Sequence, residues 1–308
     1  MNGVLLIDKT AGMTSHDVVR ELRKLYAMKK IGHAGTLDPF ATGLLILCLG
    51  KATKSLQYIV ECDKEYEAMM KLGETTNTQD LTGTVLEQRT VPANARSELE
   101  RLRSSFVGEI SQIPPMFSAR KVNGQRLYAL ARAGKTIERK ARTVRIESLI
   151  IHDVSLPYVS FRIVCSKGTY VRTFAHDLGE ALGCGAHLTR LRRTRIGRFQ
   201  VHEAYSLAQL AEKQPGAERA QTLRPVDTVL QDFPALTLNK DAAARVRYGA
   251  ELQYLSPHCT REIAAAGEEQ VLRLYNPAGE FLALAKERLV VHEEGILRKI
   301  RPIKVFSH

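Results

Sequence analysis

The sequence predicts an α+β fold, in which a domain built on a mixed β-sheet is followed by a small β-rich domain. Residues 43–49 are apolar throughout, as expected for a central strand that is buried on both faces. Residues 66–72 and 158–165 alternate between two kinds of side chain, which is the period of a half-buried strand. Segments with helical periodicity stand between these strands.

The first hundred residues are expected to contain a strand, two helices and a turn-rich connection. Residues 3–7 form a strand-sized apolar run, and Thr14 and Asp17 have the spacing of a capping box. The helix that follows has one apolar face, made by Val18, Leu22 and Leu25. Residues 75–83 are rich in turn-forming residues, and residues 97–106 have the pattern of a short amphipathic helix.

Residues 113–145 differ from the sequence around them, and we interpret them as a basic insertion in the first domain. They open with two prolines, contain an Asn-Gly turn signal and have a helical pattern at 127–133. A longer helix is expected from Val171 until the region of Gly183 and Gly185 stops it.

The end of the chain is expected to form a separate domain. A short helix at 207–212 is followed by KQPGAERAQT, residues 213–222, which has the composition of a linker. We therefore divide the chain into domains at 1–232 and 233–308. In the second domain, LRLY and FLALAK flank Asn-Pro-Ala-Gly at 276–279, which is the pattern of a β-hairpin.

The chain is strongly basic, with 45 Lys and Arg residues against 33 Asp and Glu residues. Such an excess favours a polyanionic partner, although many basic proteins have none. Residues 1–232 hold 34 basic and 24 acidic residues, whereas the remainder holds 11 and 9. Residues 120–147 carry nine basic and two acidic side chains, and residues 187–198 carry five arginines and no acid. We expect these two segments to bind phosphates.

Cysteine usage and hydropathy argue against secreted and membrane proteins. The five cysteines are scattered and form no Cys-X-X-Cys pair, so we expect reduced thiols and a cytoplasmic protein. No apolar run is as long as a membrane span, and the first residues lack the pattern of a signal peptide. Cys184 and His187 resemble half of a metal site without a second half, and no nucleotide-binding glycine motif occurs. Neither a metal nor a cofactor is therefore expected.

The segment GHAGTLDPFATGLLILCLG, residues 32–50, places a single acidic residue in a loop of small residues. This residue, Asp38, precedes Pro39, whose ring pushes it into an extended conformation. Gly35 and Gly43 give the loop backbone freedom, and the buried strand after it makes a rigid support for a reactive side chain. The alternative is that Asp-Pro only forms a turn, which is the ordinary role of this pair.

Two other segments offer groups that could act together with a carboxylate. In CSKGTYVR, residues 165–172, a strand leads through a turn into a helix that starts near Tyr170 and Arg172. Arg172 could bind a carboxylate or a phosphate with two N–H groups, or it could be a solvated helix arginine. Tyr66 could stack on a nucleotide base, or it could be a tyrosine of the core.

Four segments of the chain resemble the TruB family of tRNA pseudouridine synthases and occur in the family's order. They are GHAGTLDPFATGLL, DKEYEAMMKLGETTNTQDLTG, IPPMFSARKVNGQRLYALAR and CSKGTYVRTFAHDLGEALGCGAHLTRLRRTRIGRF, and they span most of residues 1–200. The resemblance implies a mainly antiparallel sheet flanked by helices, and FPALTLNKDAAARVRYGAEL resembles the start of a PUA-type RNA-binding domain. One departure is Thr10, where the family commonly has proline, and it concerns the local turn.

The resemblance also implies roles for individual residues. Asp38 corresponds to the catalytic aspartate, Tyr66 to the tyrosine that stacks on the target base, and Arg172 to the arginine that pairs with the aspartate. The implied substrate-binding residues, which line the pocket or contact the displaced nucleotides of the T-loop, are His33, Tyr66, Tyr170 and Leu191.

The implied reaction converts the uridine at position 55 of the tRNA T-loop to pseudouridine. The glycosidic C–N bond breaks, and the uracil rotates and rejoins the sugar through carbon, so no redox cofactor or metal is required. Glycosidases generally use two carboxylates. One prominent carboxylate, Asp38, fits uracil because its leaving anion is already delocalised, and we expect an adjacent Arg172 to keep Asp38 ionised.

The expected partner is tRNA, bound through its T-arm stem-loop after the target base has been turned out of the loop. The sequence indicates neither a membrane nor an obligate protein partner, and we expect a monomer. Two alternatives stay open. The protein could be a uridine synthase that acts on other RNAs, or a tRNA-binding or tRNA-folding factor for which catalysis is secondary.

Overall fold

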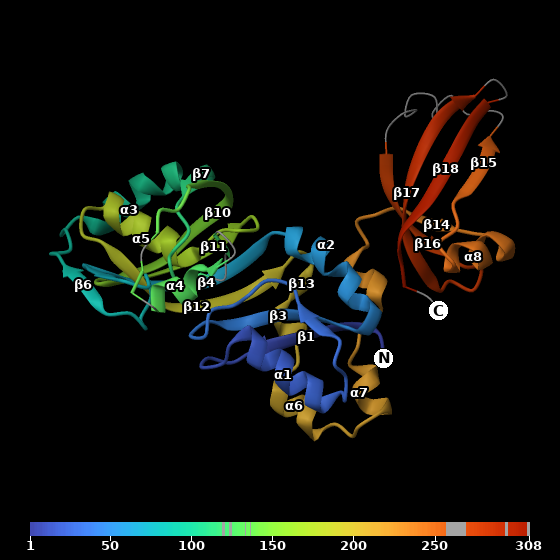
Figure 1. The fold of residues 1–308 in the computed structure, drawn as a ribbon. Coiled ribbons are helices and arrows are strands. Elements are labelled where there is room, and N and C mark those ends of the chain that lie inside the picture. Colours follow the sequence, from blue (N-terminus) through green and yellow to red (C-terminus); the bar gives the residue numbers. More distant parts are fainter. Residues whose placement is uncertain are drawn as a thin grey trace. The chain divides into compact units, whose positions relative to one another are not determined.

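The structure is a computed structural model that describes residues 1–118, 121–122, 125–132, 134–135, 137–256, 269–292 and 295–306. The chain divides into two compact units (Figure 1). The larger unit comprises Leu5–Leu47 and Ile59–Arg219, and the smaller comprises Met1–Val4, Cys48–Tyr58 and Ala220–His308. No single cut in the sequence separates these units, and the division into functional domains at 1–232 and 233–308 stays a prediction.

A nine-stranded, mainly antiparallel sheet lies in the larger unit, except for the start of its first strand and the end of its third, which belong to the smaller unit. Its strands are β1 Gly3–Lys9, β2 Ile31–His33, β3 Thr42–Leu49, β4 Lys64–Leu72, β7 Gly108–Gln112, β10 Arg142–Ser155, β11 Tyr158–Cys165, β12 Ala186–Ile196 and β13 Phe199–Gln200. The main path runs β1-β3-β12-β4-β11-β10-β7, with β2 beside β3 and β13 beside β12. Strand β12 pairs with β3 in parallel and with β4 in antiparallel orientation, so the sheet is mixed as predicted.

Helices and two short hairpins lie between these strands or follow the last of them. The α-helices are α1 Ser15–Leu25, α2 Leu56–Glu61, α3 Ala95–Arg103, α4 Leu127–Arg132, α5 Val171–Ala181, α6 Leu207–Glu212 and α7 Ala217–Gln221. The 3-10 helices are η1 Gly50–Ser55, η2 Ser104–Phe106, η3 Val201–Glu203 and η4 Val226–Val229. The hairpins pair β5 Glu74–Thr76 with β6 Val85–Gln88, and β8 Lys121–Val122 with β9 Gln125–Arg126. No helix in the described part of the chain is long and apolar enough to cross a membrane.

Local sequence signals explain the elements that support the site. Thr14 Oγ1 accepts a hydrogen bond from the Asp17 N–H at 3.0 Å, and the Asp17 carboxylate accepts one from the Thr14 N–H at 2.9 Å, which is the predicted capping box. Strand β4 alternates as predicted, and Phe174 of α5 is buried in the same core. Removing such an aromatic side chain costs about 3–5 kcal/mol, so this core fixes α5 on the sheet.

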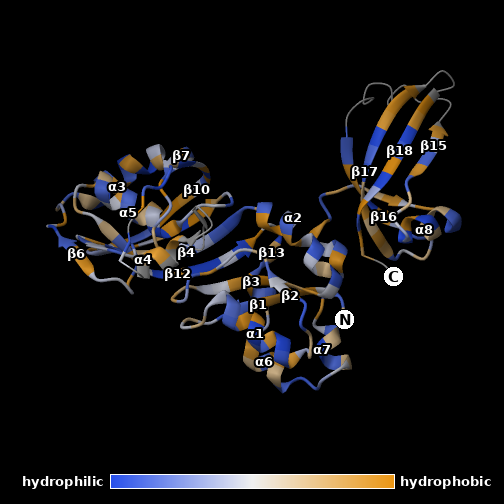
Figure 2. Cartoon of the chain, in the orientation of Figure 1, coloured by the Kyte–Doolittle hydropathy of each residue, from blue (hydrophilic) through white to orange (hydrophobic). Residues whose placement is uncertain are grey.

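The smaller unit contains a five-stranded sheet in the order β14-β16-β17-β18-β15. Its elements are β14 Ala235–Thr237, α8 Lys240–Arg247, β15 Leu252–Ser256, β16 Glu269–Tyr275, β17 Phe281–His292 and β18 Gly295–Val305. The hairpin predicted at 276–279 is confirmed, because Asn276 Oδ1 accepts hydrogen bonds from the N–H groups of Ala278 and Glu280. Strands β17 and β18 carry both apolar and hydrophilic stretches (Figure 2).

The prediction of a linker at residues 213–222 is wrong, because the segment contains α7 and a buried arginine. Arg219 is 9% exposed and donates hydrogen bonds to the backbone carbonyls of Lys213 and Leu25. Composition predicted a loose segment here, but a guanidinium that satisfies several carbonyls fixes it to α1.

Candidate active site

Asp38 lies in the loop between β2 and β3, and the structure confirms the turn that Asp-Pro predicts. The backbone forms a turn, since the Asp38 carbonyl accepts a hydrogen bond from the Ala41 N–H at 3.1 Å. The side chain is nevertheless a candidate reagent, because its carboxylate is 30% exposed and pairs with a buried arginine. The turn therefore sets the direction of the carboxylate.

The backbone on each side of Asp38 is attached to the N-terminal segment. The Leu37 N–H donates to Ser15 Oγ at 2.9 Å, and the Ser15 hydroxyl lies 3.2 Å from the Leu37 carbonyl oxygen. The Pro39 carbonyl accepts a hydrogen bond from the Gly12 N–H at 2.8 Å. Helix α1 and the turn before it thus hold both neighbours of Asp38, and little backbone freedom is left at the carboxylate.

Lys9 stabilises the turn before α1 through hydrogen bonds of its side chain. The residue is 1% exposed, and its Nζ donates to the carbonyls of Thr10, Met13 and Pro39 at 2.9, 2.8 and 3.3 Å. Burial lowers the pKa of Lys9 to about 8. Gly12 has a φ of +85°. The turn therefore forms with Thr10 in place of proline, because the lysine and the glycine define it.

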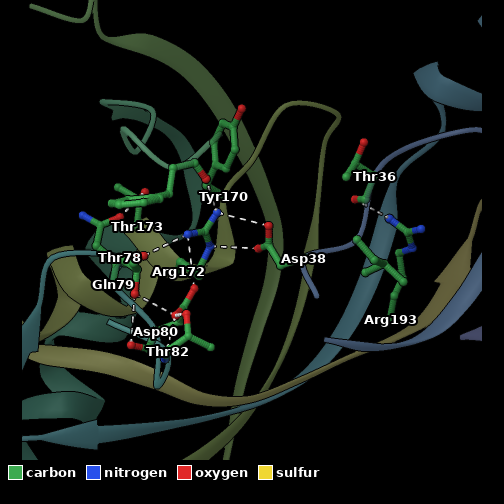
Figure 3. Close-up of polar contacts among 12 residues, drawn as sticks. Thr36, Asp38, Thr78, Gln79, Asp80, Thr82, Tyr170, Arg172, Thr173 and Arg193 are labelled. Atoms are coloured by element: carbon green, nitrogen blue, oxygen red, sulfur yellow. Dashed lines mark hydrogen bonds and ion pairs between the residues drawn. The ribbon is translucent and has the colours of Figure 1, made fainter. Parts of the chain in front are cut away.

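Arg172, at the second position of α5, is 3% exposed, and its guanidinium contacts Asp38, Thr78 and Asp80 (Figure 3). Nε lies 2.8 Å from Asp38 Oδ2, and Nη2 donates to Asp38 Oδ1 at 3.2 Å. Nη1 donates to the Thr78 carbonyl at 2.8 Å, and Nη2 to the Phe117 carbonyl at 2.8 Å. These contacts hold the guanidinium that binds the Asp38 carboxylate in one orientation.

Asp80 is a second carboxylate that pairs with Arg172, and the sequence did not predict this role. Asp80 Oδ2 lies 3.2 Å from Arg172 Nη1, so the guanidinium stands between two carboxylates (Figure 3). Asp80 Oδ1 accepts from the Thr78 and Thr82 hydroxyls and from the Thr82 N–H at 2.7, 2.6 and 2.9 Å. The only sequence signal is an aspartate between threonines in a segment read as a turn-rich connection.

Burial raises the pKa of Asp38 above the usual aspartate value, and the negative charge of Asp80 raises it further. Arg172 and Lys9 lower it, Arg172 more strongly. The expectation that Arg172 favours the ionised form gives the right sign for this pair, but burial is the larger effect. The Asp80 side chain is only 4% exposed, so Asp38 is the member of the pair that can reach a substrate.

A cavity of about 260 Å³ brings together five of the six predicted site residues. These are Asp38, Tyr66, Tyr170, Arg172 and Leu191. Tyr66 and Leu191 are 8% and 7% exposed, and they come from the neighbouring strands β4 and β12. The cavity is large enough for a pyrimidine ring and has a carboxylate beside an aromatic side chain.

His33 is the sixth predicted residue, and it does not line this cavity. It ends strand β2, in the segment that leads to the Asp38 loop. Its Nδ1 is buried without a hydrogen-bond partner among the described residues. Burial and the nearby charge of Arg193 lower the pKa of His33, so its ring is uncharged at neutral pH.

Arg193 of β12 supports the Asp38 loop from inside the core. The residue is 1% exposed, and it donates to the carbonyls of Leu44 and Gly35 at 2.7 and 3.0 Å. It also donates to the Thr36 carbonyl at 3.5 Å (Figure 3). Burial raises the pKa of the Tyr66 phenol, and the positive charge of the Arg193 side chain, which lies close to it, lowers this pKa. One buried cation therefore connects the loop of the carboxylate, the strand behind it and the tyrosine.

The phosphate-binding interpretation of residues 187–198 is wrong for Arg193, since a buried guanidinium cannot meet a phosphate. Two other arginines of β12 are already paired, Arg192 with Asp8 at 2.7 Å and Arg195 with Glu65 at 3.8 Å. The number of arginines in this strand indicates an exposed basic surface. The pairing of the strand within the sheet, however, places some of these side chains in the core.

No group of three His, Cys, Asp or Glu side chains within the described ranges is placed to hold a metal ion. Cys184 Sγ donates to the Gly185 carbonyl at 3.5 Å, and His187 Nδ1 hydrogen-bonds the Glu74 carbonyl at 3.1 Å. The two residues with metal-like spacing thus have backbone partners.

The sequence matches two family models and many curated proteins. Residues 23–171 match the "TruB family pseudouridylate synthase (N terminal domain)", and residues 172–231 the "tRNA pseudouridylate synthase B C-terminal domain". A relative named tRNA pseudouridine synthase B from Burkholderia pseudomallei (strain 668) is 47% identical, over 94% of this chain and 97% of its own length. Another of that name from Histophilus somni (strain 2336) is 41% identical, over 96% and 95%.

Two solved structures are similar over nearly the whole chain. One is described as an H/ACA RNP bound to a substrate RNA containing 2′-deoxyuridine, with a TM-score of 0.71 and 25% identity. The other is described as a Cbf5-Nop10-Gar1 complex, with a TM-score of 0.71 and 27% identity. Both matches cover 99% of this chain and 85% of the other chain. These similarities confirm the predicted fold class.

Proposed function

The chain belongs to the TruB family of pseudouridylate synthases, and we propose that it converts the uridine at position 55 of the tRNA T-loop to pseudouridine. The observation that carries this proposal is the pairing of Asp38 with Arg172 beside a cavity that Tyr66 also lines. The name of the curated relatives supports tRNA as the substrate.

Asp38 acts on the ribose of the flipped uridine in this proposal. Attack of the carboxylate on C1′ and removal of a ribose proton are the two possible first steps, and both require the ionised form. The positive charge of Arg172 favours that form, and burial opposes it. The fixed guanidinium also orients the carboxylate, which lowers the entropy cost of reaching the transition state.

The cavity holds the uracil while its bond to the sugar changes. Turning a base out of an RNA loop costs a few kcal/mol. Tyr66 offsets part of this cost by stacking, which is worth about 1–3 kcal/mol per base in single-strand binders. Tyr170 and Leu191 bound the ring, and the uncharged His33 contacts the nucleotides that the flipped base leaves behind.

Residues 1–232 serve as the catalytic domain and residues 233–308 as a PUA-like RNA-binding domain. The basic excess of 120–147 supports contacts with phosphates of the T-arm, whose folded shape gives specificity. The enzyme acts as a monomer in the cytoplasm, and five scattered cysteines without a Cys-X-X-Cys pair support a reducing compartment.

The test is incubation of the purified chain, with a chelator present, with an unmodified T-arm stem-loop and with full-length tRNA. We expect pseudouridine at position 55 when each uridine is mapped separately, and none with Asp38→Asn. Product at other positions only would support a synthase for other RNAs. Binding of tRNA without product from the unaltered chain would support a folding factor.

A further inference from the structure

Ser118 has a buried hydroxyl group that no described residue satisfies. The residue is 4% exposed, and its Oγ has no hydrogen-bond partner among the described residues. Leaving such a group unpaired destabilises the folded protein, and most buried hydroxyls therefore have partners. An exception at a functional site points to a partner that the substrate supplies.

The position of Ser118 makes the substrate a plausible source of that partner. Ser118 lines the same cavity as Asp38, Tyr66 and Arg172. The preceding residue, Phe117, is fixed to the catalytic arginine, because its carbonyl accepts a hydrogen bond from Arg172 Nη2 at 2.8 Å. The hydroxyl is thus held beside the reacting groups by the segment that begins the basic insertion.

Three other polar side chains around the cavity already have hydrogen-bond partners in the backbone. The Lys64 ammonium donates to the Val60 carbonyl at 2.6 Å, and the Thr169 hydroxyl donates to the Ser166 carbonyl at 3.0 Å. The Ser166 hydroxyl accepts a hydrogen bond from the Arg145 N–H at 2.9 Å. Ser118 therefore differs from these neighbours in offering an unused hydroxyl.

We propose that Ser118 is a uracil-binding residue, whose hydroxyl pairs with the polar edge of the flipped base. This inference rests on the proposed function. The edge consists of N3–H between two carbonyl groups, O2 and O4, and a serine hydroxyl can donate to a carbonyl or accept from N3–H. A small hydroxyl-bearing side chain can therefore serve either kind of group.

The rotation of the uracil during the reaction gives this pairing a purpose. The base leaves the ribose through N1 and returns through C5, which requires half a turn about the axis through N3 and C6. This turn exchanges O2 with O4 and leaves N3–H on the axis. A hydroxyl at this edge meets equivalent groups before and after the turn, so Ser118 can hold the detached uracil in both orientations.

The test compares Ser118→Ala with the unaltered enzyme under single-turnover conditions. Three synthetic T-arm stem-loops carry uridine, 2-thiouridine or 4-thiouridine at the target position, because sulfur is a weaker hydrogen-bond acceptor than oxygen. We expect Ser118→Ala to slow the uridine reaction about two- to tenfold. We also expect at least one sulfur substitution to slow Ser118→Ala less than it slows the unaltered enzyme, because the hydrogen bond is already lost.

Two results would overturn the role of Ser118. One is a rate of Ser118→Ala that is lower than that of the unaltered enzyme by the same factor on all three stem-loops. The other is an unchanged rate on the uridine stem-loop. Ser111→Ala is the matched control, because Ser111 is exposed on β7, and its rate on each stem-loop should equal that of the unaltered enzyme. If the alanine variant melts at a lower temperature, Ser118→Cys replaces it, since a thiol is similar in shape but a weak donor. Failure of the unaltered enzyme on uridine would instead count against the proposed function.

Discussion

Gln112 exchanges two hydrogen bonds with the backbone of Tyr170. Its Nε2 donates to the Tyr170 carbonyl at 3.0 Å, and its Oε1 accepts from the Tyr170 N–H at 2.7 Å. Gln112 ends β7 and is 2% exposed, and Tyr170 is the N-cap residue of α5. One side chain thus joins the strand before the basic insertion to the helix that carries Arg172.

Replacing Gln112 by alanine should lower both stability and catalysis. The change leaves the Tyr170 N–H without a partner, at about 1–3 kcal/mol in the free energy of unfolding, whereas the Tyr170 carbonyl keeps its hydrogen bond from the Phe174 N–H. Because Arg172 lies two residues further along, we expect the single-turnover rate to fall about tenfold as well. Urea unfolding and a rate assay measure the two effects. Gln57→Ala, at an exposed position of α2, is the control, and an unchanged rate would contradict the positioning role of Gln112.

Asp38→Asn and Asp80→Asn should have different consequences. The first removes the reactive carboxylate, so we expect no measurable pseudouridine and a tRNA affinity within several-fold of the original. The second keeps Asp38 but places an amide donor against Arg172 Nη1, and we expect the rate to fall about 10- to 100-fold. Asp153→Asn, an exposed change of the same charge, should keep full activity. Full activity in Asp80→Asn would mean that Arg172 needs no second carboxylate.

The activity of the enzyme should decrease on the acid side through protonation of Asp38. Since burial and Asp80 raise the pKa of Asp38, the rate should fall at a higher pH than for an ordinary carboxyl group. Loss of the Asp80 charge removes one influence that raises this pKa, so the acid limb of Asp80→Asn should lie at lower pH. Single-turnover rates across the acid range measure both limbs. If the acid limb of Asp80→Asn lies at the same pH as that of the unaltered enzyme, or at higher pH, the influence of Asp80 on the pKa of Asp38 is contradicted.

Arg193→Met should destabilise the larger unit and disturb the Asp38 loop. The change leaves the carbonyls of Gly35 and Leu44 without their donor in the core, and we expect a loss of about 2–4 kcal/mol in the free energy of unfolding. Arg190→Met is the matched control, because this arginine is exposed on the same strand. Urea unfolding of both variants gives the comparison. Similar stability in the two would show that the buried guanidinium adds nothing to the fold.

The resemblance to the TruB family that four segments predicted is confirmed by the family models and the curated relatives. Local chemistry also predicted the capping box of α1 and the alternation of β4, because neighbours in sequence determine both. Asp80 and Arg193 could not be assigned in this way. Asp80 meets Arg172 across 92 positions of the sequence, and Arg193 becomes a core residue only because β12 pairs with β3.

Gly43 is another residue whose role depends on a segment distant in sequence, and here the backbone is involved. The sequence predicted freedom of the loop at this glycine, and its φ of +101° agrees. The structure adds a second reason, because a Cβ at this position would clash with the backbone of Arg193 on the adjacent strand. A close approach between two strands that are distant in sequence has no local signal.

Arg142, in the basic segment, should contribute to the salt dependence of tRNA binding. It is exposed at the start of β10 and forms no ion pair with a described residue, whereas Arg145 pairs with Glu147 at 2.8 Å and Asp63 at 3.3 Å. A cation that neutralises a phosphate releases counterions. Arg142→Gln should therefore make the negative slope of log affinity against log salt less steep by about 0.7–0.9.

Fluorescence titrations of Arg142→Gln and Arg145→Gln with labelled tRNA, each at several salt concentrations, measure these slopes. The Arg145 variant should change the slope less, because its guanidinium already has two carboxylate partners to leave before it can meet a phosphate. An unchanged slope for Arg142→Gln would mean that this part of the basic segment does not touch the RNA backbone. A larger change for Arg145 would mean that its ion pairs open when tRNA binds.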